Sequence, residues 1–283
     1  MGKGGEYTCD NRTVKKLFLI ALALTTLCPK LYGTAHWYVF DGKAVHVISD
    51  SVRSLEFGLP PQHVCKLHTG RNAIFISAGH MGALMQEPPR QTLVTVYSFD
   101  ALVTPIMDSA EPIGVKFQNL VQAAKRSLRG SATAAKKLNN PENRDDFRIE
   151  GALIWFSDGH AWVKTFNVSV SDWNSITVSD FRPPETKELK QDELHRLPQD
   201  KAREKSAAQT RPAVAQQGMT DLDTFLQFTM DVEADKSKGS VGRPYVRALL
   251  LPSGLQWLEG EALCSEKPEA WREWNEEPAH LPK

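Results

Sequence analysis

Two strand-length runs separated by Asp41-Gly42 are the feature that most constrains the fold of this chain. The runs, residues 35–40 and 43–49, are rich in Val, Ile, Trp and Tyr. These residue types suit the pleated, partly buried surface of a strand. An Asp-Gly pair between two such runs is the strongest short-range signal of a β-hairpin. We therefore expect an antiparallel sheet to begin here.

The rest of the chain shows further strand and helix patterns. Residues 69–72 indicate a turn between two short strands, and Ser157-Asp158-Gly159-His160 indicates another. From residue 117 to 138, apolar side chains recur at helical spacing with Lys and Arg between them, which predicts an amphipathic helix. The predicted strands are 35–40, 43–49, 64–67, 73–77, 151–156, 161–168, 175–181, 245–251 and 256–259, and the predicted helices are 117–138 and 221–234.

Residues 183–217 are rich in Pro, Lys, Glu and Gln and contain few large apolar residues. Such a composition does not offset the entropy of chain ordering by burial. We interpret the segment as a mobile excursion or a solvated helix, a polar insertion within one domain at 34–262. The helix and hairpin that follow are too small to hold a core alone, so we expect them to complete the first sheet. Residues 263–283 are interpreted as a tail that packs on the surface.

Residues 14–33 have the layout of a secretory leader: a Lys pair, an apolar run from Leu17 to Leu24, and then small and polar residues. The run is too short to span a bilayer as a helix. Because the residues before it are unusually polar, we interpret Val14 as the true start of translation. We expect residues 1–33 to be removed and the mature protein to be exported, periplasmic or extracellular, without a membrane segment. A buried N-terminal helix remains the alternative.

Charge and cysteine content narrow the classes of partner and cofactor. Lys+Arg and Asp+Glu both number 34, so no strong net field draws nucleic acid or an anionic membrane. The eight histidines lack the paired spacing of a zinc site, and no glycine-rich phosphate loop is present, so we expect no metal and no cofactor. Export would permit a disulfide between Cys65 and Cys264, but the sequence leaves open whether their Cα atoms lie close enough.

Three residues at two equal intervals carry a resemblance to a known family. Thr34 follows Gly33 at the leader junction, Asp50 lies sixteen positions later in VISDSVRS, and Lys66 lies sixteen positions beyond that in VCKLHTGRN. The arrangement resembles the proteasome β-subunit-like branch of the N-terminal-nucleophile (Ntn) hydrolases, whose mature chains begin at a threonine preceded by glycine. The order of predicted elements is also similar. NAIFISAGHMG resembles the family's buried strand ending in Ala-Gly, and GSVGRPYVRALLLPSG resembles its final helix-to-strand passage.

This resemblance implies an α+β fold, a four-layer αββα sandwich preceded by a cleavable leader, and hydrolysis of a peptide or amide bond through an acyl-Thr34 intermediate. The base would be the α-amino group that cleavage frees at Thr34, since its unperturbed pKa of about 7.7–8.0 suits proton transfer near neutral pH. Lys66 would lower the proton affinity of this amine, and Asp50 would hold Lys66 charged and oriented. The backbone N–H of Gly79 would stabilise the oxyanion. On this interpretation Lys66→Ala lowers kcat and leaves folding intact.

Other interpretations of these residues remain open. Thr34 could merely adjoin a cleavage site, and cleavage after Ala35 would leave His36 first. Asp50 could be a turn residue at a strand end, and Lys66 an exposed edge lysine. The alternative functions are a non-proteolytic Ntn amidase and a catalytically inactive, proteasome-like binding or scaffold protein. Because relatives of this type stack into rings, the resemblance implies a homo-oligomer that takes a peptide or amide substrate.

Overall fold

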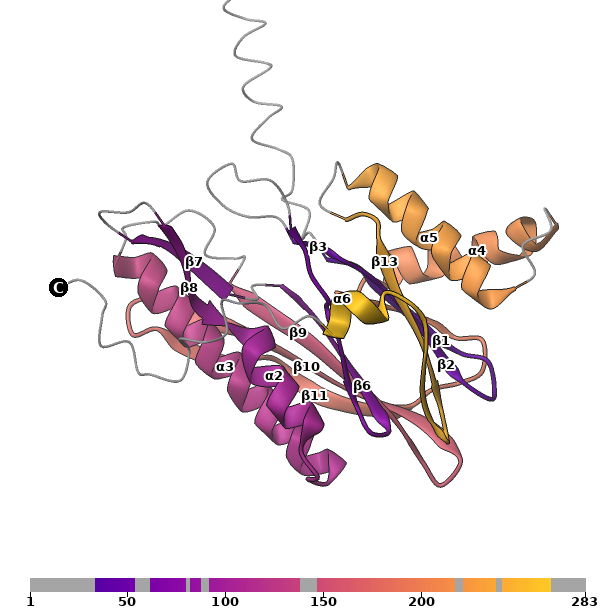
Figure 1. Cartoon of the computed structure of the whole chain (residues 1–283), viewed down its shortest axis with the longest axis horizontal. Helices are drawn as coiled ribbons and strands as arrows, with labels where there is room; N and C mark the ends of the chain where they lie inside the picture. Colours follow the sequence, from indigo (N-terminus) through magenta and orange to yellow (C-terminus); the bar gives the residue numbers. More distant parts are fainter. Residues whose placement is uncertain are drawn as a thin grey trace, which may run out of the picture. The chain divides into compact units, whose positions relative to one another are not determined.

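Two five-stranded antiparallel sheets form the centre of the described part of the chain (Figure 1). The structure is a computed structural model that describes residues 34–53, 62–79, 82–87, 92–137, 147–216, 221–237 and 241–265. All of these belong to one unit, Tyr32–Lys283. The predicted leader at 1–33 and residues 266–283 of the predicted tail lie outside the described residues.

The first sheet has the strand order β12-β1-β2-β13-β14. The hairpin predicted at Asp41-Gly42 is confirmed, because β1 and β2 pair antiparallel on either side of it. Gly42 has a φ of 95°, which favours glycine, and the Asp41 carboxylate accepts the backbone N–H of Lys43 and of Ala44 at 2.7 Å. The closing hairpin is confirmed as well, since β13 pairs with β2. The strands are β1 (His36–Phe40), β2 (Val45–Asp50), β12 (Leu194–Leu197), β13 (Tyr245–Leu251) and β14 (Gly254–Glu259).

The second sheet has the order β11-β10-β9-β6-β5. The predicted turn at 157–160 is confirmed, with positive φ at Asp158 and Gly159. The strand predicted at 64–67 is placed wrongly: β5 begins at Leu67, because Lys66 turns inward to an ion pair and residues 64–66 make no strand. The strands are β5 (Leu67–Gly70), β6 (Ala73–Gly79), β9 (Arg148–Ser157), β10 (His160–Asp172) and β11 (Thr177–Glu188).

Two smaller ladders and the described helices complete the architecture. The helix predicted at 117–138 is confirmed within α3, and the one predicted at 221–234 is confirmed as α5, which Asp221 caps by accepting the Thr224 N–H at 2.9 Å. The ladder β7–β8 and the helix α2 were not expected from the sequence. These elements are β3 (Val52–Arg53), β4 (Gln62–His63), β7 (Gly82–Glu87), β8 (Thr92–Ser98), α2 (Phe99–Asp108), α3 (Ile113–Lys137), α4 (Lys201–Gln216), α5 (Leu222–Lys236) and α6 (Glu261–Ser265).

Successive side chains along a strand point to opposite faces of the sheet, so a single strand can contribute to two different apolar clusters. On β6, Ile74 and Ile76 pack with residues of the first sheet, whereas Phe75 packs with α2 and α3. On β2, Val47 faces the second sheet and Ile48 packs against α5. The helix pair α2 and α3 therefore covers the second sheet, and α4 and α5 pack on the first (Figure 1). The chain is a mixed α/β protein with two antiparallel sheets and, among the described residues, five helices.

The interpretation of residues 183–217 as a mobile excursion or a solvated helix is wrong for residues 183–197, whereas residues 201–216 do form a helix, α4, most of whose described residues are exposed. The segment contains the end of β11, the whole of β12 and α4, and β12 pairs with β1 as an edge strand of the first sheet. Its few apolar side chains are the ones that are buried: Leu189 is 2% exposed and Leu197 1%. The average composition of the segment does not indicate that these leucines are buried. They lie in the core because backbone hydrogen bonds to neighbouring strands place them there. Deleting the segment would therefore remove part of the first sheet.

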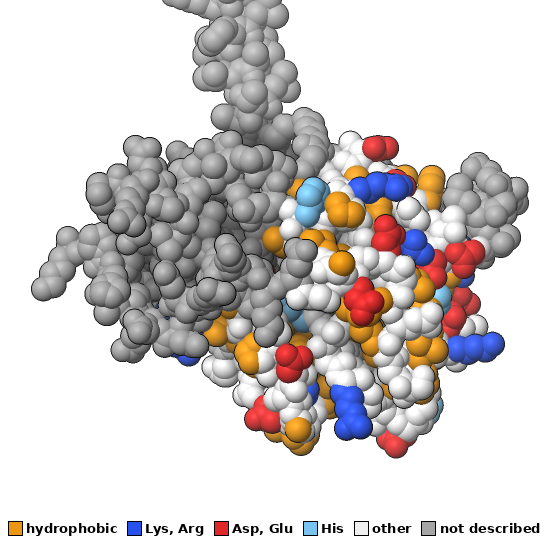
Figure 2. All heavy atoms as spheres, viewed as in Figure 1, with side chains coloured by type: hydrophobic (Ala, Val, Ile, Leu, Met, Phe, Trp, Pro, Cys, Tyr) orange, Lys and Arg blue, Asp and Glu red, His pale blue; other side chains and the backbone are white. Residues whose placement is uncertain are grey.

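The surface of the described residues carries charges of both signs. Figure 2 shows Lys and Arg side chains interspersed with Asp and Glu on the part of this face that is coloured, in keeping with a formal net charge of zero. None of the described helices combines the length and the hydropathy that crossing a bilayer requires.

Candidate active site

Thr34 lies directly before β1 and is 7% exposed. Two positions further along, His36 points at the second sheet, since its Nε2 lies 2.8 Å from the Ser77 carbonyl of β6 and donates to it. Because strand side chains alternate, Thr34 belongs to the same face as His36. The Asp50 carboxylate secures the chain between them, accepting the N–H of Ala35 at Oδ1 over 3.2 Å.

Lys66 joins the three residues that the sequence singled out. Its Nζ lies 3.2 Å from Thr34 Oγ1 and 2.8 Å from each carboxylate oxygen of Asp50, and it also donates to the Val52 carbonyl. Lys66 is 4% exposed and Asp50 is fully buried. The interpretations of Asp50 as a simple turn residue and of Lys66 as an exposed edge lysine are therefore wrong.

Burial raises the pKa of the Asp50 carboxyl to about 6, because desolvation outweighs the opposing effects of the Lys66 charge and hydrogen bonds. Above that pH the two side chains form a buried ion pair whose cation faces the Thr34 hydroxyl. A positive charge in this position favours loss of a proton from neighbouring groups. The chemistry available here is activation of a hydroxyl nucleophile.

Gly79, the predicted oxyanion donor, ends β6 with a φ of 112°. A Cβ at this position would lie 2.2 Å from the Arg148 carbonyl oxygen, so only glycine fits without a backbone shift. Gly79 follows Ser77 by two residues, and His36 follows Thr34 by two. The His36–Ser77 hydrogen bond therefore ties the end of β6 to the start of β1. The role of the Gly79 N–H stays a prediction.

A disulfide between Cys65 and Cys264 holds the segment that carries Lys66. Their Cα atoms are 4.8 Å apart, which settles the question that the sequence left open. The bond fastens residue 65 to α6 across 199 positions of sequence, and the Val64 N–H adds a hydrogen bond to the Ser51 carbonyl at 2.8 Å. The position of Lys66 is thus held both by α6, near the C-terminal end of the described residues, and by the segment that follows β2.

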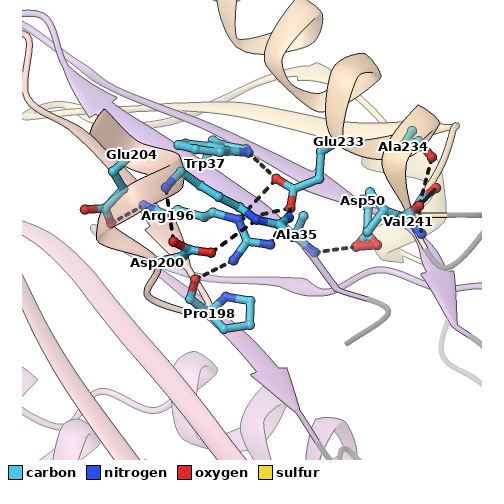
Figure 3. A network of polar contacts seen from close by, with 12 residues as sticks. Ala35, Trp37, Asp50, Arg196, Pro198, Asp200, Glu204, Glu233, Ala234 and Val241 are labelled. Atoms are coloured by element: carbon cyan, nitrogen blue, oxygen red, sulfur yellow. Dashed lines mark hydrogen bonds and ion pairs between the residues drawn. The ribbon is translucent and has the colours of Figure 1, made fainter. Parts of the chain in front are cut away.

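A buried ionic network behind the site was not found by sequence reasoning (Figure 3). Arg196 of β12 donates from Nε to both oxygens of Glu233 in α5 at 3.1 Å, and Trp37 of β1 donates to the same carboxylate at 3.0 Å. Arg203 of α4 also pairs with Glu233. Figure 3 shows this network beside the Ala35–Asp50 hydrogen bond. No local sequence signal could find it, because its members come from four separate elements.

His46 links the first hairpin to α5 and makes stability depend on pH. Its ring nitrogens lie 3.0 Å from Asp223 and from Asp41. Burial lowers the pKa of His46, but the hydrogen bonds and charges of these carboxylates outweigh it and raise the net pKa; His46 also interacts electrostatically with Asp221. The protonated form is therefore favoured in the folded state. Its stabilisation is complete below the unfolded pKa of about 6.5 and is lost as pH rises through the raised folded value.

We expect the free energy of unfolding of His46→Gln to fall less, or to rise more, between about pH 6 and about pH 9 than that of the wild type. Burial lowers the pKa of His36 and of His195 to about 3, so these two residues add stability as pH rises through about 6.5, equally in both proteins. Denaturant unfolding at the two pH values measures this. The matched control is His160→Gln, because His160 pairs with Glu188 on the exposed surface and salt and solvent screen such a pair. An unchanged pH dependence in His46→Gln would contradict the role assigned to this side chain.

Comparisons with known proteins add no relative: the chain matches neither a protein-family model nor a curated protein. In the described part of the chain, no group of three or more His, Cys, Asp or Glu residues is arranged to hold a metal ion.

Proposed function

We propose that this chain is a threonine-type N-terminal-nucleophile hydrolase that cleaves a peptide or amide bond through an acyl-Thr34 intermediate. One observation carries the proposal: Lys66 Nζ contacts both Thr34 Oγ1 and the Asp50 carboxylate in a buried setting. Burying two charges is costly unless they are well paired, and it rarely improves stability over apolar packing. A buried pair directed at a hydroxyl is therefore typical of a functional site.

In the proposed mechanism, cleavage before Thr34 frees its α-amino group. This amine takes the proton of Thr34 Oγ1 as the oxygen bonds to the substrate carbonyl carbon. The Lys66 ammonium stabilises the charge that develops on Oγ1, and the Gly79 N–H stabilises the oxyanion. The carbon–nitrogen bond then breaks, the protonated amine gives its proton to the leaving nitrogen, and an acyl-Thr34 ester remains. Water, deprotonated by the same amine, hydrolyses the ester and restores Thr34.

The proposal extends to the four-layer αββα sandwich of proteasome-like Ntn hydrolases. It is supported by the shared apolar cluster of the two sheets and by the packing of one helix pair against each sheet. It is also supported by the strand order, in which the nucleophile's strand β1 lies between β12 and β2. Export after removal of residues 1–33 belongs to the same proposal.

The first test is the N-terminus of the purified protein. Intact-mass and N-terminal sequence analysis is expected to find Thr34 first, because only that end creates both nucleophile and base. If the chain cleaves itself, Thr34→Ala retains the preceding residues, whereas the control Thr210→Ala, an exposed threonine of α4, is processed normally. A mature chain beginning at His36 contradicts the threonine mechanism and favours the scaffold alternative. If the mature chain begins at Thr34 and hydrolyses small amides but not peptides, the non-proteolytic amidase is favoured.

We further propose that the mature protein forms a homo-oligomer, as ring-forming relatives of this type do. Phe181 on β11 is 58% exposed, an apolar side chain that a second copy of the chain could cover. Multi-angle light scattering is expected to give a mass several times that of one chain. Phe181→Ser is expected to lower that mass, and a monomer in the wild type would contradict the assembly.

A further inference from the structure

A small cavity of about 50 Å³ lies where the edge strands of the two sheets, β11 and β12, come together. It is bordered by side chains from β9, β10 and β11 and by the chain that follows β12. A volume of this size holds a group comparable to one or two water molecules. The polar residues of the lining are Glu150, Thr165, Asn167, Arg182, Glu185 and Gln199.

This cavity is lined by two buried acceptors, of which one lacks a partner in the described part of the chain. Glu150 is 6% exposed; its Oε2 accepts the Gln199 N–H at 3.1 Å, and its Oε1 lies 4.0 Å from Nε of Arg148. Asn167 is 7% exposed, and its Oδ1 has no hydrogen-bond partner among the described residues. Buried polar atoms are seldom left unpaired in folded proteins, because an unpaired atom loses its hydrogen bonds to water and gains none within the protein. An acceptor of this kind in a cavity wall points to an occupant that donates hydrogen bonds.

Strand register places this cavity beside the candidate nucleophile. Leu197, part of its wall, is the direct partner of His36 on β1, two residues after Thr34. Glu150 pairs with Ala78 on β6, the residue before Gly79. The cavity therefore adjoins both the strand of the nucleophile and the strand of the proposed oxyanion donor, about one strand spacing and two residues from Thr34.

The charges of the lining select the chemistry of the occupant. Glu150 and Glu185 are anionic, and Asn167 Oδ1 is an acceptor. The one cation, Arg182, is exposed and donates to Gln199 Oε1 at 3.3 Å. A primary ammonium group has three donors, one positive charge and the size of the cavity. A carboxylate would lie next to the carboxylates of Glu150 and Glu185, and a neutral hydroxyl would donate one hydrogen bond where an ammonium group donates three.

We propose that this cavity is an ammonium subsite, and that it selects substrates that carry a primary amine, such as a lysine side chain, close to the bond that is cleaved. The role in selection rests on the hydrolase function proposed above, whereas binding of an ammonium group does not. Glu150 supplies the charge, and Asn167 orients the donors. Gln199, whose N–H holds Glu150, positions the carboxylate.

Binding is tested first without catalysis, in the full chain carrying Thr34→Ala. Propylammonium is titrated while the side-chain amide resonances of Asn167 and Gln199 are followed by NMR. We expect saturable shifts, and affinity at least about tenfold weaker in Glu150→Gln, which keeps an acceptor for the Gln199 N–H but removes the charge. Asn167→Asp, which adds a charge with the same shape, is expected to bind more tightly. Glu188→Gln, an exposed carboxylate of β11, is the matched control and is expected to change nothing.

Tetramethylammonium, which has the same charge but no donor, is expected not to bind, and propionate is expected not to bind. The absence of saturable propylammonium binding would mean a water-filled cavity and would overturn the subsite, whether or not the protein is a hydrolase. Propionate binding in its place would overturn the assigned chemistry.

The role in selection is measured separately in the wild type. Amides that carry lysine next to the cleaved bond are compared with matched norleucine compounds. We expect kcat/KM to favour lysine at least about tenfold and the preference to disappear in Glu150→Gln. Equal rates for both substrates, with ammonium binding intact, would overturn the role in selection only. No hydrolysis of any amide by a protein that binds propylammonium would overturn the hydrolase function and the selection that rests on it, while the ammonium site would stand.

Discussion

Lys66→Ala is expected to lower the free energy of unfolding by about 3–5 kcal/mol near neutral pH and to lower kcat/KM by at least about a hundredfold. The first effect arises because Lys66 and Asp50 are both buried, so removing the ammonium leaves an uncompensated carboxylate in the core. The loss of activity arises because the Thr34 hydroxyl loses its contact with the Lys66 ammonium group. The sequence led us to expect that Lys66→Ala leaves folding intact, and the buried ion pair corrects that expectation.

The pH dependence of this variant gives a sharper test. Burial raises the pKa of Asp50 in the folded protein to about 6 even with Lys66 present, above the ordinary 3.8. Without Lys66 the folded state binds a proton at Asp50 over a wider range, so the stability of Lys66→Ala falls as pH rises above about 4 and the carboxyl ionises. Chemical unfolding across this range is expected to show a deficit that grows with pH.

A double variant separates folding from catalysis. In Lys66→Met with Asp50→Asn the unpaired charge is gone, and the amide still offers Ala35 an acceptor. We expect most of the lost stability to return and the activity to remain low. Lys43→Ala, at the exposed tip of the first hairpin, is the control and is expected to match the wild type. Recovery of activity together with stability would show that Lys66 acts only as a structural residue.

Glu233→Ala is expected to destabilise the fold by about 3–5 kcal/mol, because Arg196 is then left buried without its carboxylate partner. The Trp37 N–H loses its acceptor as well. The network joins α4, α5, β12 and β1, so the thermal transition is expected to move by several degrees or more. Thermal and denaturant unfolding measure this, and a loss of less than about 1 kcal/mol, the value of an exposed pair, would contradict the assigned burial.

Two further variants test the cause of that loss. Asp235→Ala removes an exposed carboxylate from the same helix and is expected to change stability by no more than about 0.5 kcal/mol. Glu233→Met combined with Arg196→Met replaces the pair by apolar side chains of similar length and is expected to recover much of the loss. Glu233 also raises the pKa of Asp50 through its charge, so the acid limb of the pH–rate profile is expected to move to lower pH when Glu233 is replaced.

Local chemistry explains which elements were predictable. The Asp41-Gly42 turn, the periodic apolar residues of α3 and the Asp221 cap of α5 each act within a few residues of chain. Each of these signals is complete within its own segment, so the sequence could be interpreted without knowing the fold. Thr34, Asp50 and Lys66 were singled out differently, by the resemblance of their spacing to that of a known family.

The misplaced and missing features depend on partners that are distant in the chain. Residues 183–197 have a polar average composition, and only pairing with β1 reveals that Leu194 and Leu197 are core residues. Leu189 is buried as well, and its N–H donates to the Ala161 carbonyl of β10. The strand predicted at 64–67 was displaced because Lys66 pairs with Asp50 instead of joining the sheet. Propensity did not decide these positions; long-range pairing did.

The sequence by itself determined the first and last hairpins and the helices α3 and α5, and its resemblance to a known family singled out the three residues of the candidate site. Only the tertiary structure decided that Lys66 and Asp50 are buried, that Cys65 pairs with Cys264, and that Glu233 meets Arg196. The physical reason is that turn chemistry and periodicity are properties of neighbouring residues. Burial and ion pairing are set by which distant segments the packed sheets and helices bring together.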